Sequence, residues 1–393
     1  MTDYYGTAGD DAIVVGNDSD ASIFGYDGND TLEGGGGNDV LEGGTGDDVL
    51  VAGLGVNSLF GGDGHDIYVV LSTLDVIVEA LDAGWDQVMC AASDFVLGAN
   101  LEVLTLLAGG LTGSGNDLDN VLIGNDAGNT LRGGPGNDFL DGTSGDDQLY
   151  GEAGNDYLTG GDGQDQLDGG VDDDWLDGGA GADVLIGGLG GDTLVLDNVD
   201  DVVVEDASGG YDWILTTLDG YVLGANLEGL VLQGSAVVGS GNVADNALSG
   251  NELHNTLSGL DGDDYLSGQD GDDDLHGDGG ADTLIGGAGA DTLTGGAGSD
   301  SFTFNALPWN AESGDTITDF VAGQDQILLW ILQEPTFIGD AGFSGAGPEI
   351  RAMDDGVNST VELDLDGDAT ADMTITVLGT PSITAGDFAF LLP

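Results

Sequence analysis

In steps of nine, residues 133–195 read GGPGNDFLD, GTSGDDQLY, GEAGNDYLT, GGDGQDQLD, GGVDDDWLD, GGAGADVLI and GGLGGDTLV. Glycine opens every unit, aspartate holds position six and leucine holds position eight. Glycine reaches backbone angles that a Cβ forbids, so the first six residues of each unit predict a turn. The last three residues predict a very short strand whose middle side chain points inward. Turn and strand therefore alternate with a period of nine.

Two such units make one coil of eighteen residues with a turn on each side. Stacked coils would pair their strands in parallel at a spacing of about 4.8 Å. The predicted fold class is all-β, a parallel β-roll (β-solenoid). Position six then forms two columns of carboxylates, one with Asp138, Asp156, Asp174 and Asp192, and the other with Asp147, Asp165 and Asp183.

These carboxylate columns need a cation. Two unit charges about 4.8 Å apart repel by roughly 0.9 kcal/mol in bulk water and by roughly 3.5 kcal/mol at an effective dielectric constant of 20. Summed along a roll, this repulsion rivals the whole stability of a domain, about 5–15 kcal/mol. Carboxylates and turn carbonyls offer only oxygen, which suits Ca²⁺ with its six to eight irregular ligands better than octahedral Mg²⁺. An isolated GxGxD would indicate an ordinary turn, but seven in phase predict multiple Ca²⁺ ions.

The spacing G-G-x-G-x-D-x-U-x resembles the nonapeptide of the RTX (repeats-in-toxin) family of secreted bacterial proteins. The resemblance implies that each calcium ion lies between one turn and the next turn on the same side. It also implies a secreted, extracellular protein.

The same unit recurs on both sides of the central stretch. The predicted division is 1–69, first roll block; 70–114, β-rich insert; 115–195, second roll block; 196–240, second insert; 241–303, third roll block; 304–393, C-terminal cap and type I secretion region. The further predicted metal ligands at position six are Asp11, Asp30, Asp39, Asp48 and Asp66 in the first block and Asp264, Asp273, Asp282, Asp291 and Asp300 in the third. Asp39 faces Asn57, so we expect a weaker site there.

The two inserts are copies of one another at an offset of 126 residues. DVIVE at 75–79 matches DVVVE at 201–205, and FVLGANLE at 95–102 matches YVLGANLE at 221–228. Apolar and polar residues alternate in both, which predicts strands in wider coils that join the rolls. The inserts also resemble linker segments between the nonapeptide blocks of large RTX proteins.

After each insert come two units with asparagine at position six, namely Asn120 and Asn129, then Asn246 and Asn255. Asparagine can form ladders by side-chain hydrogen bonding without a net charge. Our hypothesis is that these coils start each roll without metal.

The period ends near residue 304. Residues 315–320 and 323–328 predict two strands around a turn, and 361–378 predicts another strand pair. This region resembles the C-terminal cap and secretion region of RTX proteases and lipases, which implies type I export with an uncleaved signal. A cap also covers the last strand edge of the roll.

An acidic run near the C-terminus departs from the EF-hand pattern, because its glycine comes too early and no glutamate follows at position twelve. Either a further calcium loop or a solvated acidic hairpin turn fits it. Its carboxylates are Asp364, Asp366, Asp368 and Asp372.

The charge of the chain excludes several classes of partner. There are 74 acidic residues against two basic ones, and the net charge is −72. Nucleic acid and anionic membrane surfaces are therefore excluded. The strict period and 40% hydrophobic content favour order that depends on a cation. The N-terminus has no apolar h-region of a Sec signal, and the longest apolar run, 327–332, is too short to span a membrane. The single cysteine, Cys90, allows no internal disulfide and is predicted to be buried.

Recognisable catalytic motifs are absent from the sequence. His65, His254 and His276 share no ligand spacing, so zinc is not expected. Neither HExxH nor GxSxG occurs, and the blocks leave no segment for a separate catalytic domain. We therefore expect no enzyme.

The predicted function is that of a secreted protein that folds on cooperative Ca²⁺ binding outside the cell, as a structural, matrix or adhesion component. The expected partners are calcium ions, the type I export machinery, and extracellular polysaccharide or the cell surface. One alternative is an accessory module of a polysaccharide-acting enzyme, with Trp85 and Tyr211 on the sugar. Another is an extracellular enzyme with an unrecognised site in the inserts, using Glu79 or Glu205.

Overall fold

The computed structural model describes residues 2–16, 19–81, 84–307, 314–379 and 382–392. The parts of the predicted first block 1–69, first insert 70–114 and cap 304–393 that fall on residues 1, 17–18, 82–83, 308–313, 380–381 and 393 lie outside the described residues. The chain forms two compact units, Met1–Gly210 and Tyr211–Pro393. Their boundary falls inside the predicted second insert. Each unit is described by itself.

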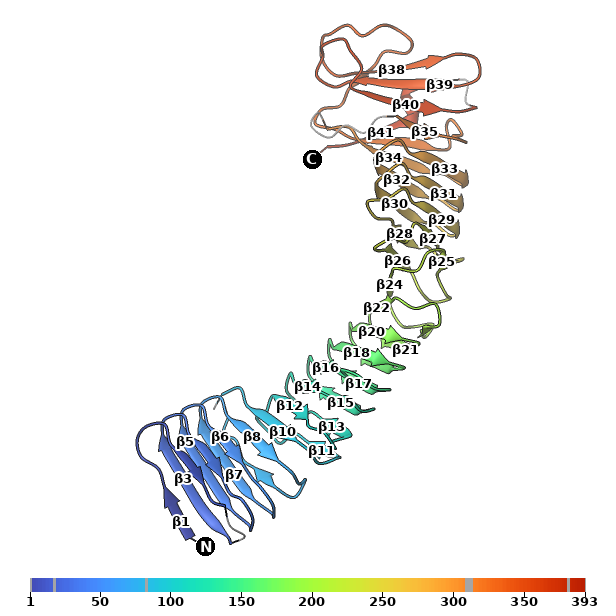
Figure 1. The fold of residues 1–393 in the computed structure, drawn as a ribbon. Helices are drawn as coiled ribbons and strands as arrows, with labels where there is room; N and C mark the ends of the chain where they lie inside the picture. The colour runs from blue at the N-terminus through green and yellow to red at the C-terminus, as the bar shows by residue number, and fades with distance from the viewer. Residues whose placement is uncertain (1, 17–18, 82–83, 308–313, 380–381, 393) are drawn as a thin grey trace. The chain divides into compact units, whose positions relative to one another are not determined.

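The first unit is a stack of coils with a parallel sheet on each side (Figure 1). The longer sheet contains β2 (Ala12–Val14), β4 (Thr31–Glu33), β6 (Val49–Val51), β8 (Ile67–Val70), β10 (Gln87–Cys90), β12 (Val103–Leu106), β14 (Val121–Ile123), β16 (Phe139–Asp141), β18 (Tyr157–Gly163), β20 (Trp175–Gly181) and β22 (Thr193–Leu196).

The opposite side of the first unit consists of two shorter sheets. One contains β1 (Thr2–Tyr5), β3 (Ala21–Asp27), β5 (Val40–Thr45), β7 (Ser58–Asp63) and β9 (Val76–Ile77). The other contains β11 (Phe95–Val96), β13 (Thr112–Ser114), β15 (Thr130–Pro135), β17 (Gln148–Ala153), β19 (Gln166–Val171), β21 (Val184–Leu189) and β23 (Val202–Val204).

The strand register confirms the eighteen-residue coil. On β18 and β20, Tyr157 pairs with Trp175 and Leu158 with Leu176. The leucine at position eight is fully buried along the roll, as at Leu158 and Leu176. The predicted all-β parallel β-roll is therefore correct, and its core is a narrow stack of leucines between the two sheets.

Glycine is usual at position four, and Gly154 is required there because adjacent coils touch. Gly154 has a φ of 122°, and a Cβ on it would collide with the carbonyl oxygen of Gly136 in the preceding coil. A side chain at this position would therefore push the coils apart.

The coil continues through the first insert. Gln87 on β10 pairs with Ile67 on β8, twenty residues earlier, and with Val103 on β12, sixteen residues later. One coil is thus two residues longer than the repeat and the next is two residues shorter. The two coils together restore the period, so the repeats after the insert stay in phase. Cys90 is buried on β10, as predicted.

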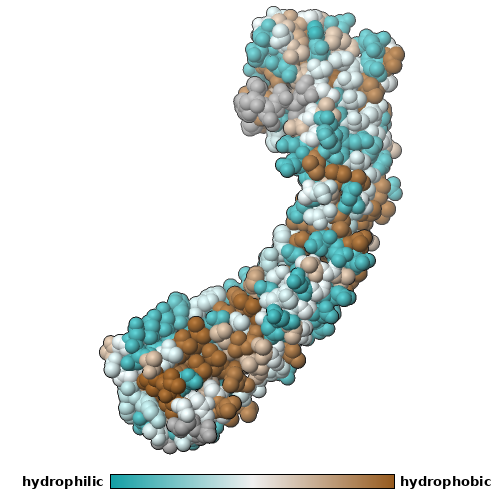
Figure 2. All heavy atoms as spheres, viewed as in Figure 1, coloured by the Kyte–Doolittle hydropathy of each residue, from teal (hydrophilic) through white to brown (hydrophobic). Residues whose placement is uncertain are grey.

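Aromatic side chains at position seven stack on the outside of the roll. The rings of Phe139 and Tyr157 lie 5.3 Å apart, and those of Tyr157 and Trp175 lie 6.1 Å apart, nearly parallel in both cases. A second stack joins Tyr5, Phe24 and Tyr26. Figure 2 shows further apolar surface, in brown, on the viewed face of the first coils.

The second unit repeats the two-sided arrangement and then changes. One sheet contains β24 (Trp213–Thr216), β26 (Gly229–Leu232), β28 (Ala247–Ser249), β30 (Tyr265–Asp270), β32 (Thr283–Ala288), β34 (Ser301–Asn305), β36 (Gln326–Trp330) and β41 (Phe388–Leu391). The other contains β25 (Tyr221–Val222), β27 (Val238–Ser240), β29 (Thr256–Asp261), β31 (Asp274–Gly279), β33 (Thr292–Ala297), β35 (Asp315–Ile317), β40 (Met373–Val377), β39 (Ser359–Asp364), β38 (Glu349–Asp354) and β37 (Thr336–Phe337).

One strand prediction in the cap needs correction. β35 and β36 form where strands are predicted, but they do not pair with each other around a turn. β35 pairs with β33 and β40, whereas β36 pairs with β34 and β41. The chain completes another coil here, so consecutive strands lie on opposite sides. The predicted pair in 361–378 is correct, since β39 and β40 are antiparallel.

The described residues contain no α-helix, only the short 3₁₀ helix η1 (Ala385–Asp387). Among these residues no helix has the length and apolar character needed to cross a membrane.

The leucine stack predicts a large difference between core and surface truncations. Leu158→Ala should lower the free energy of unfolding by about 2–5 kcal/mol, because it leaves a cavity between two sheets that cannot collapse freely. Val171→Ala, at a site 38% exposed on β19, should change it by less than about 1 kcal/mol. Urea unfolding in saturating calcium, followed by circular dichroism, measures both. Equal losses would contradict the core assignment.

Candidate metal sites

The position-six aspartates form columns that run along the roll. In the second block the backbone N–H of Asp138 donates to Oδ1 of Asp156 at 2.7 Å, and the N–H of Asp156 donates to Oδ1 of Asp174 at 2.8 Å. On the other side, the N–H of Asp147 donates to Oδ1 of Asp165 at 2.7 Å. Each side chain thus reaches back by one coil, to the backbone N–H of the aspartate eighteen residues earlier. These carboxylates are at most 3% exposed.

The second oxygen of these carboxylates is the atom left for a ligand. It is buried and accepts no hydrogen bond in Asp30, Asp39, Asp48, Asp66, Asp138, Asp147, Asp156, Asp165, Asp174, Asp183, Asp264, Asp273, Asp282 and Asp291. A buried carboxylate oxygen without a partner is costly unless a cation binds it.

The surroundings of this oxygen fit a hard cation. A Cβ added at Gly160, which opens a unit, would collide with Oδ2 of Asp165 and would lie 2.6 Å from the carbonyl oxygen of Gly178 in the next coil. A carboxylate and a turn carbonyl therefore converge on space that only glycine leaves open. Because every donor is oxygen, the site suits Ca²⁺.

Neither arginine of the chain neutralises the columns. Arg132 pairs on the surface with Glu152 at 3.4 Å, and Arg351 pairs with Glu362 in the cap. These are the two basic residues of the sequence. The compensating charge must come from outside the protein.

Burial and mutual repulsion favour the protonated form of the column carboxylates when no metal is bound. Burial raises the pKa of Asp174 to about 8, and the charges of Asp156 and Asp192 add to the shift. For the same reason the pKa of Asp264 rises to about 7. In both cases a backbone hydrogen bond opposes the shift but does not cancel it.

The asparagine units correct one prediction. Asn120 and Asn129 belong to consecutive units, which face opposite sides of the roll. They therefore lie in opposite columns and do not form a ladder with each other. Instead, Oδ1 of Asn120 accepts the N–H of Asn116 at 2.7 Å, and its Nδ2 donates to the carbonyl of Leu101 at 3.1 Å. Its backbone N–H donates to Oδ1 of Asp138 at 2.7 Å. The asparagine is thus the first member of its column, bonded locally where a preceding turn is missing.

The columns continue onto carboxylates that the repeat pattern does not include, and beyond Asp66 the N–H of Asp86 in turn donates to Oε2 of Glu102 at 2.8 Å. The N–H of Asp66 donates to Oδ1 of Asp86, that of Asp291 to Oδ1 of Asp315 and that of Asp300 to Oδ1 of Asp325. The spacings are 20, 24 and 25 residues, so counting in nines misses them. Asp75 and Asp201 extend two other columns at the regular spacing of 18. Counting eighteen residues on from Asn57 and Asp183 in the sequence would have identified Asp75 and Asp201 as members of these columns.

Two predicted ligands have less regular surroundings. Asp11 is half-buried and its Oδ2 accepts the N–H of Thr7 at 2.5 Å. Asp39 lies opposite Asn57, as predicted, and its N–H donates to Oδ1 of that amide at 2.9 Å.

Comparison with known families identifies the repeat. The RTX calcium-binding nonapeptide repeat (4 copies) matches residues 5–41, 15–50, 42–69, 114–149, 132–167, 141–175, 159–194 and 168–203. The chain is an RTX repeat protein. The C-terminal region of this RTX protein, residues 231–390, matches the serralysin C terminal of peptidase M10. RTX repeats bind calcium, so Ca²⁺ is the ion assigned to the columns.

Two solved structures are similar to this RTX protein. The solution structure of the AlgE6R3 subunit from the Azotobacter vinelandii mannuronan C5-epimerase is 26% identical, covering 37% of this chain and 78% of that chain with a TM-score of 0.20. The crystal structure of the extracellular lipase LipA from Serratia marcescens is 12% identical, covering 85% of this chain and 67% of that chain with a TM-score of 0.26. No curated protein sequence matches the chain.

The acidic run of the cap forms the loop between β39 and β40. Carboxylate oxygens of Asp364, Asp366 and Asp372 lie within 4.8 Å of one another, and Asp368 is outside this group. Both Asp364 and Asp372 accept backbone N–H groups of the loop, for example those of Gly367 and Leu365 at 2.7 Å. The loop is a hairpin turn whose buried carboxylate, Asp364, is satisfied by the backbone.

The raised pKa values predict that acid partly replaces calcium. The pKa of Asp174 is about 8 in the folded, metal-free roll and about 3.9 in an unfolded chain, so the folded state holds more protons between these values. Stability without metal is therefore greatest below about pH 4 and falls as the pH rises towards about 8. In chelator, the β-signal in far-UV circular dichroism should be stronger at pH 5 than at pH 8. The same weak signal at both values would contradict this prediction.

Proposed function

We propose that this RTX protein is a secreted, non-catalytic protein that folds when calcium fills its carboxylate columns outside the cell. The observation that carries the proposal is the second carboxylate oxygen of the fourteen column aspartates from Asp30 to Asp291 named above, which is buried and without a hydrogen bond. The first oxygen is bonded to the fold, so the second is held in place for the ion.

The columns couple binding to folding. The site between two turns exists only when the coils are stacked, so the binding free energy is also folding free energy. Sites of the extracellular class bind calcium at about 10⁻⁴–10⁻³ M. Calcium at this level fills them outside the cell, whereas scarce cytosolic calcium leaves the chain unfolded and fit for a narrow exporter. The serralysin-type C terminal supports type I export.

The proposed role is structural, as a matrix, adhesion or surface component. The buried carboxylates of the described columns accept hydrogen bonds from the backbone of neighbouring coils. These bonds link successive coils into a continuous roll, which supports a structural role. With a net charge of −72, the folded protein would also hold calcium at its surface and bridge to other acidic polymers.

Calcium titration tests the proposal. Far-UV circular dichroism of the purified chain should show a steep rise in β-signal with calcium and little with magnesium. Asp174→Asn should move the midpoint to higher calcium because a ligand oxygen is lost, and should strengthen the β-signal in chelator because a buried charge is removed.

Asp162→Asn is the matched control, because it makes the same charge change at an exposed position near the end of β18. It should leave the calcium midpoint unchanged. A flat calcium response in the unmodified chain would refute calcium-driven folding.

A second function, binding of polysaccharide, has one observation in its favour. Trp85 is 51% exposed and lines a hollow of about 510 Å³ with Phe139, Tyr157 and Trp175. The stacked rings cover each other's faces, so Trp85 is the residue best placed to stack on a sugar. Tyr211, in the other unit, is 46% exposed and lies against Trp213.

Affinity electrophoresis in a neutral glucan distinguishes this second function. If the module binds sugar, glucan should retard the calcium-loaded chain, and Trp85→Ala should remove the retardation. Trp330→Ala removes a tryptophan of equal exposure, 51%, and should have no effect. Unretarded migration of the unmodified chain would exclude glucan binding.

A further inference from the structure

The first roll ends at a position where a glutamate takes the place of an opening glycine. β7 pairs with β9 so that Leu59 faces Ile77, and the N–H of Val78 donates to the carbonyl of Leu59 at 3.0 Å. The same register places Glu79 opposite Gly61, one coil on. In the preceding coils the opening residue of the unit is glycine, as at Gly61. The carbonyl of that glycine lies beside the column aspartate of the coil before it, as Gly61 lies beside Asp48.

Gly43 shows that regular arrangement. A Cβ added there would collide with Oδ2 of Asp48 and would lie 2.6 Å from the carbonyl oxygen of Gly61. One turn supplies the carboxylate and the next coil supplies a backbone carbonyl. At Glu79 the next coil supplies a side-chain carboxylate to the same space.

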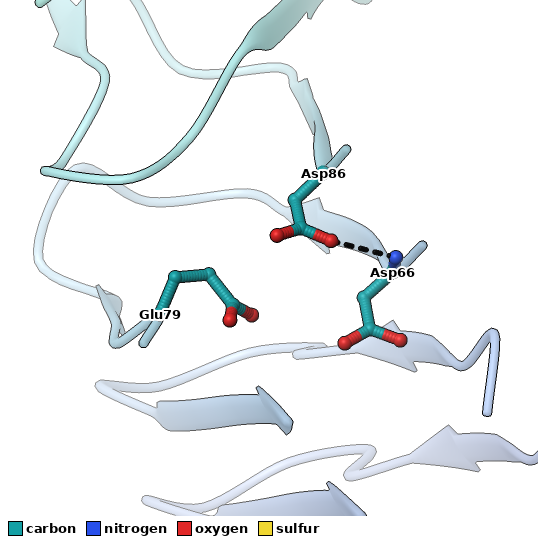
Figure 3. A group of neighbouring side chains, drawn as sticks. All are labelled: Asp66, Glu79 and Asp86. Carbon is teal, nitrogen blue, oxygen red and sulfur yellow. Dashed lines mark hydrogen bonds between the residues drawn. The ribbon is translucent and has the colours of Figure 1, made fainter. Parts of the chain in front are cut away.

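Three carboxylates meet as a result. Asp66, Glu79 and Asp86 each offer one oxygen within 4.8 Å of the others (Figure 3). They come from the residue before β8, from the segment after β9 and from the residue before β10, and the N–H of Asp66 donates to Oδ1 of Asp86 at 2.8 Å.

The cluster contains oxygens with no other use in the fold. Asp66 and Asp86 are each 1% exposed, and Oδ2 of each is buried without a hydrogen-bond partner. Glu79 is 9% exposed. Three acidic groups are therefore removed from water together, and neither arginine of the chain pairs with them.

The glutamate is held in place by a residue that breaks the repeat. Tyr68 stands at position eight, where leucine is usual, and is fully buried. Its hydroxyl donates to Oε1 of Glu79 and accepts the N–H of Gly61 at 2.7 Å. Nδ2 of Asn100 donates to the backbone carbonyl of Glu79 at 3.1 Å. Such second contacts orient metal ligands.

We propose that Asp66, Glu79 and Asp86 form a calcium site of a second type, which closes the first roll and ties the insert to it. Its ligand set has three carboxylates where the regular turn site has carboxylates and carbonyls. Because affinity for Ca²⁺ rises with ligand charge, this site binds more tightly than the regular ones and fills first. The proposal rests on calcium being the ion of the columns, as proposed above.

The duplication repeats the three acidic residues in the sequence. At the offset of 126 stand Asp192, Glu205 and Asp212, while Leu194 replaces Tyr68. Both copies of the insert therefore carry the three acidic residues, but only the first copy has the tyrosine.

Crystals of the full chain grown in calcium and exchanged into terbium test the site directly. The anomalous map should show an ion bonded by all three carboxylates, in addition to ions in the regular turns. Ions in the turns but none at the cluster would overturn this proposal alone. Ions at neither place would overturn calcium binding by the columns as well.

Variants test the site in solution. Hydrogen exchange of the full chain in limiting calcium should show β8 and β10 protected before the strands of the second block. Glu79→Gln should abolish that early protection and raise the calcium needed by about tenfold or more. Glu42→Gln, an exposed glutamate on β5 with the same charge change, should not alter it.

A third variant covers the case in which Glu79→Gln does not fold. Glu79→Gly restores the regular opening residue and its carbonyl, so it should fold and protect β8 and β10 together with the other coils. Early protection that persists in Glu79→Gly would overturn the proposal, as would equal behaviour of Glu79→Gln and Glu42→Gln.

Discussion

Repulsion between buried carboxylates is the constraint on which the rest of this protein depends. Column aspartates such as Asp156 and Asp174 use one oxygen to accept the backbone N–H of the preceding coil and leave the other oxygen buried and without a hydrogen bond. The hydrogen bond makes the carboxylate part of the fold, while the charge makes the fold unfavourable without a cation. In the proposed function, folding and ion binding are therefore one event rather than two.

The hydrophobic core is too narrow to relieve this constraint. Each nonapeptide buries one large side chain, such as Leu158, and spends its first six residues on a glycine-rich turn. Glycine loses the most backbone freedom on folding, so the turns that allow coils to touch also raise the entropic cost of ordering them. With only two leucines per coil to offset that cost, the proposed function assigns the remaining stability to the bound ions.

The columns have a direction, and their ends are where the sequence departs from the repeat. Every member donates its N–H to the next carboxylate, so the first member lacks a donor and the last lacks an acceptor. Asn120 solves the first problem with the N–H of Asn116. Asp86, followed by Glu102, and Asp315 solve the second with carboxylates from outside the repeats. Residues that depart from the repeat thus mark the ends of the columns, where the hydrogen bonds of the first and last members need partners from outside the repeats.

The sequence by itself determined the β-roll, the buried leucine stack and the two carboxylate columns, because a strict period of nine leaves one way to superpose equivalent residues. It also predicted the pairing of Asp39 with Asn57, which follows from the same count. Only the tertiary structure decided the acceptors at spacings of 20, 24 and 25 residues, the separation of β35 from β36 onto opposite sides, and the place of Glu79 opposite Gly61. Where the period breaks, the residue that faces a given aspartate depends on which strands pair through space, and the linear pattern carries no record of that pairing.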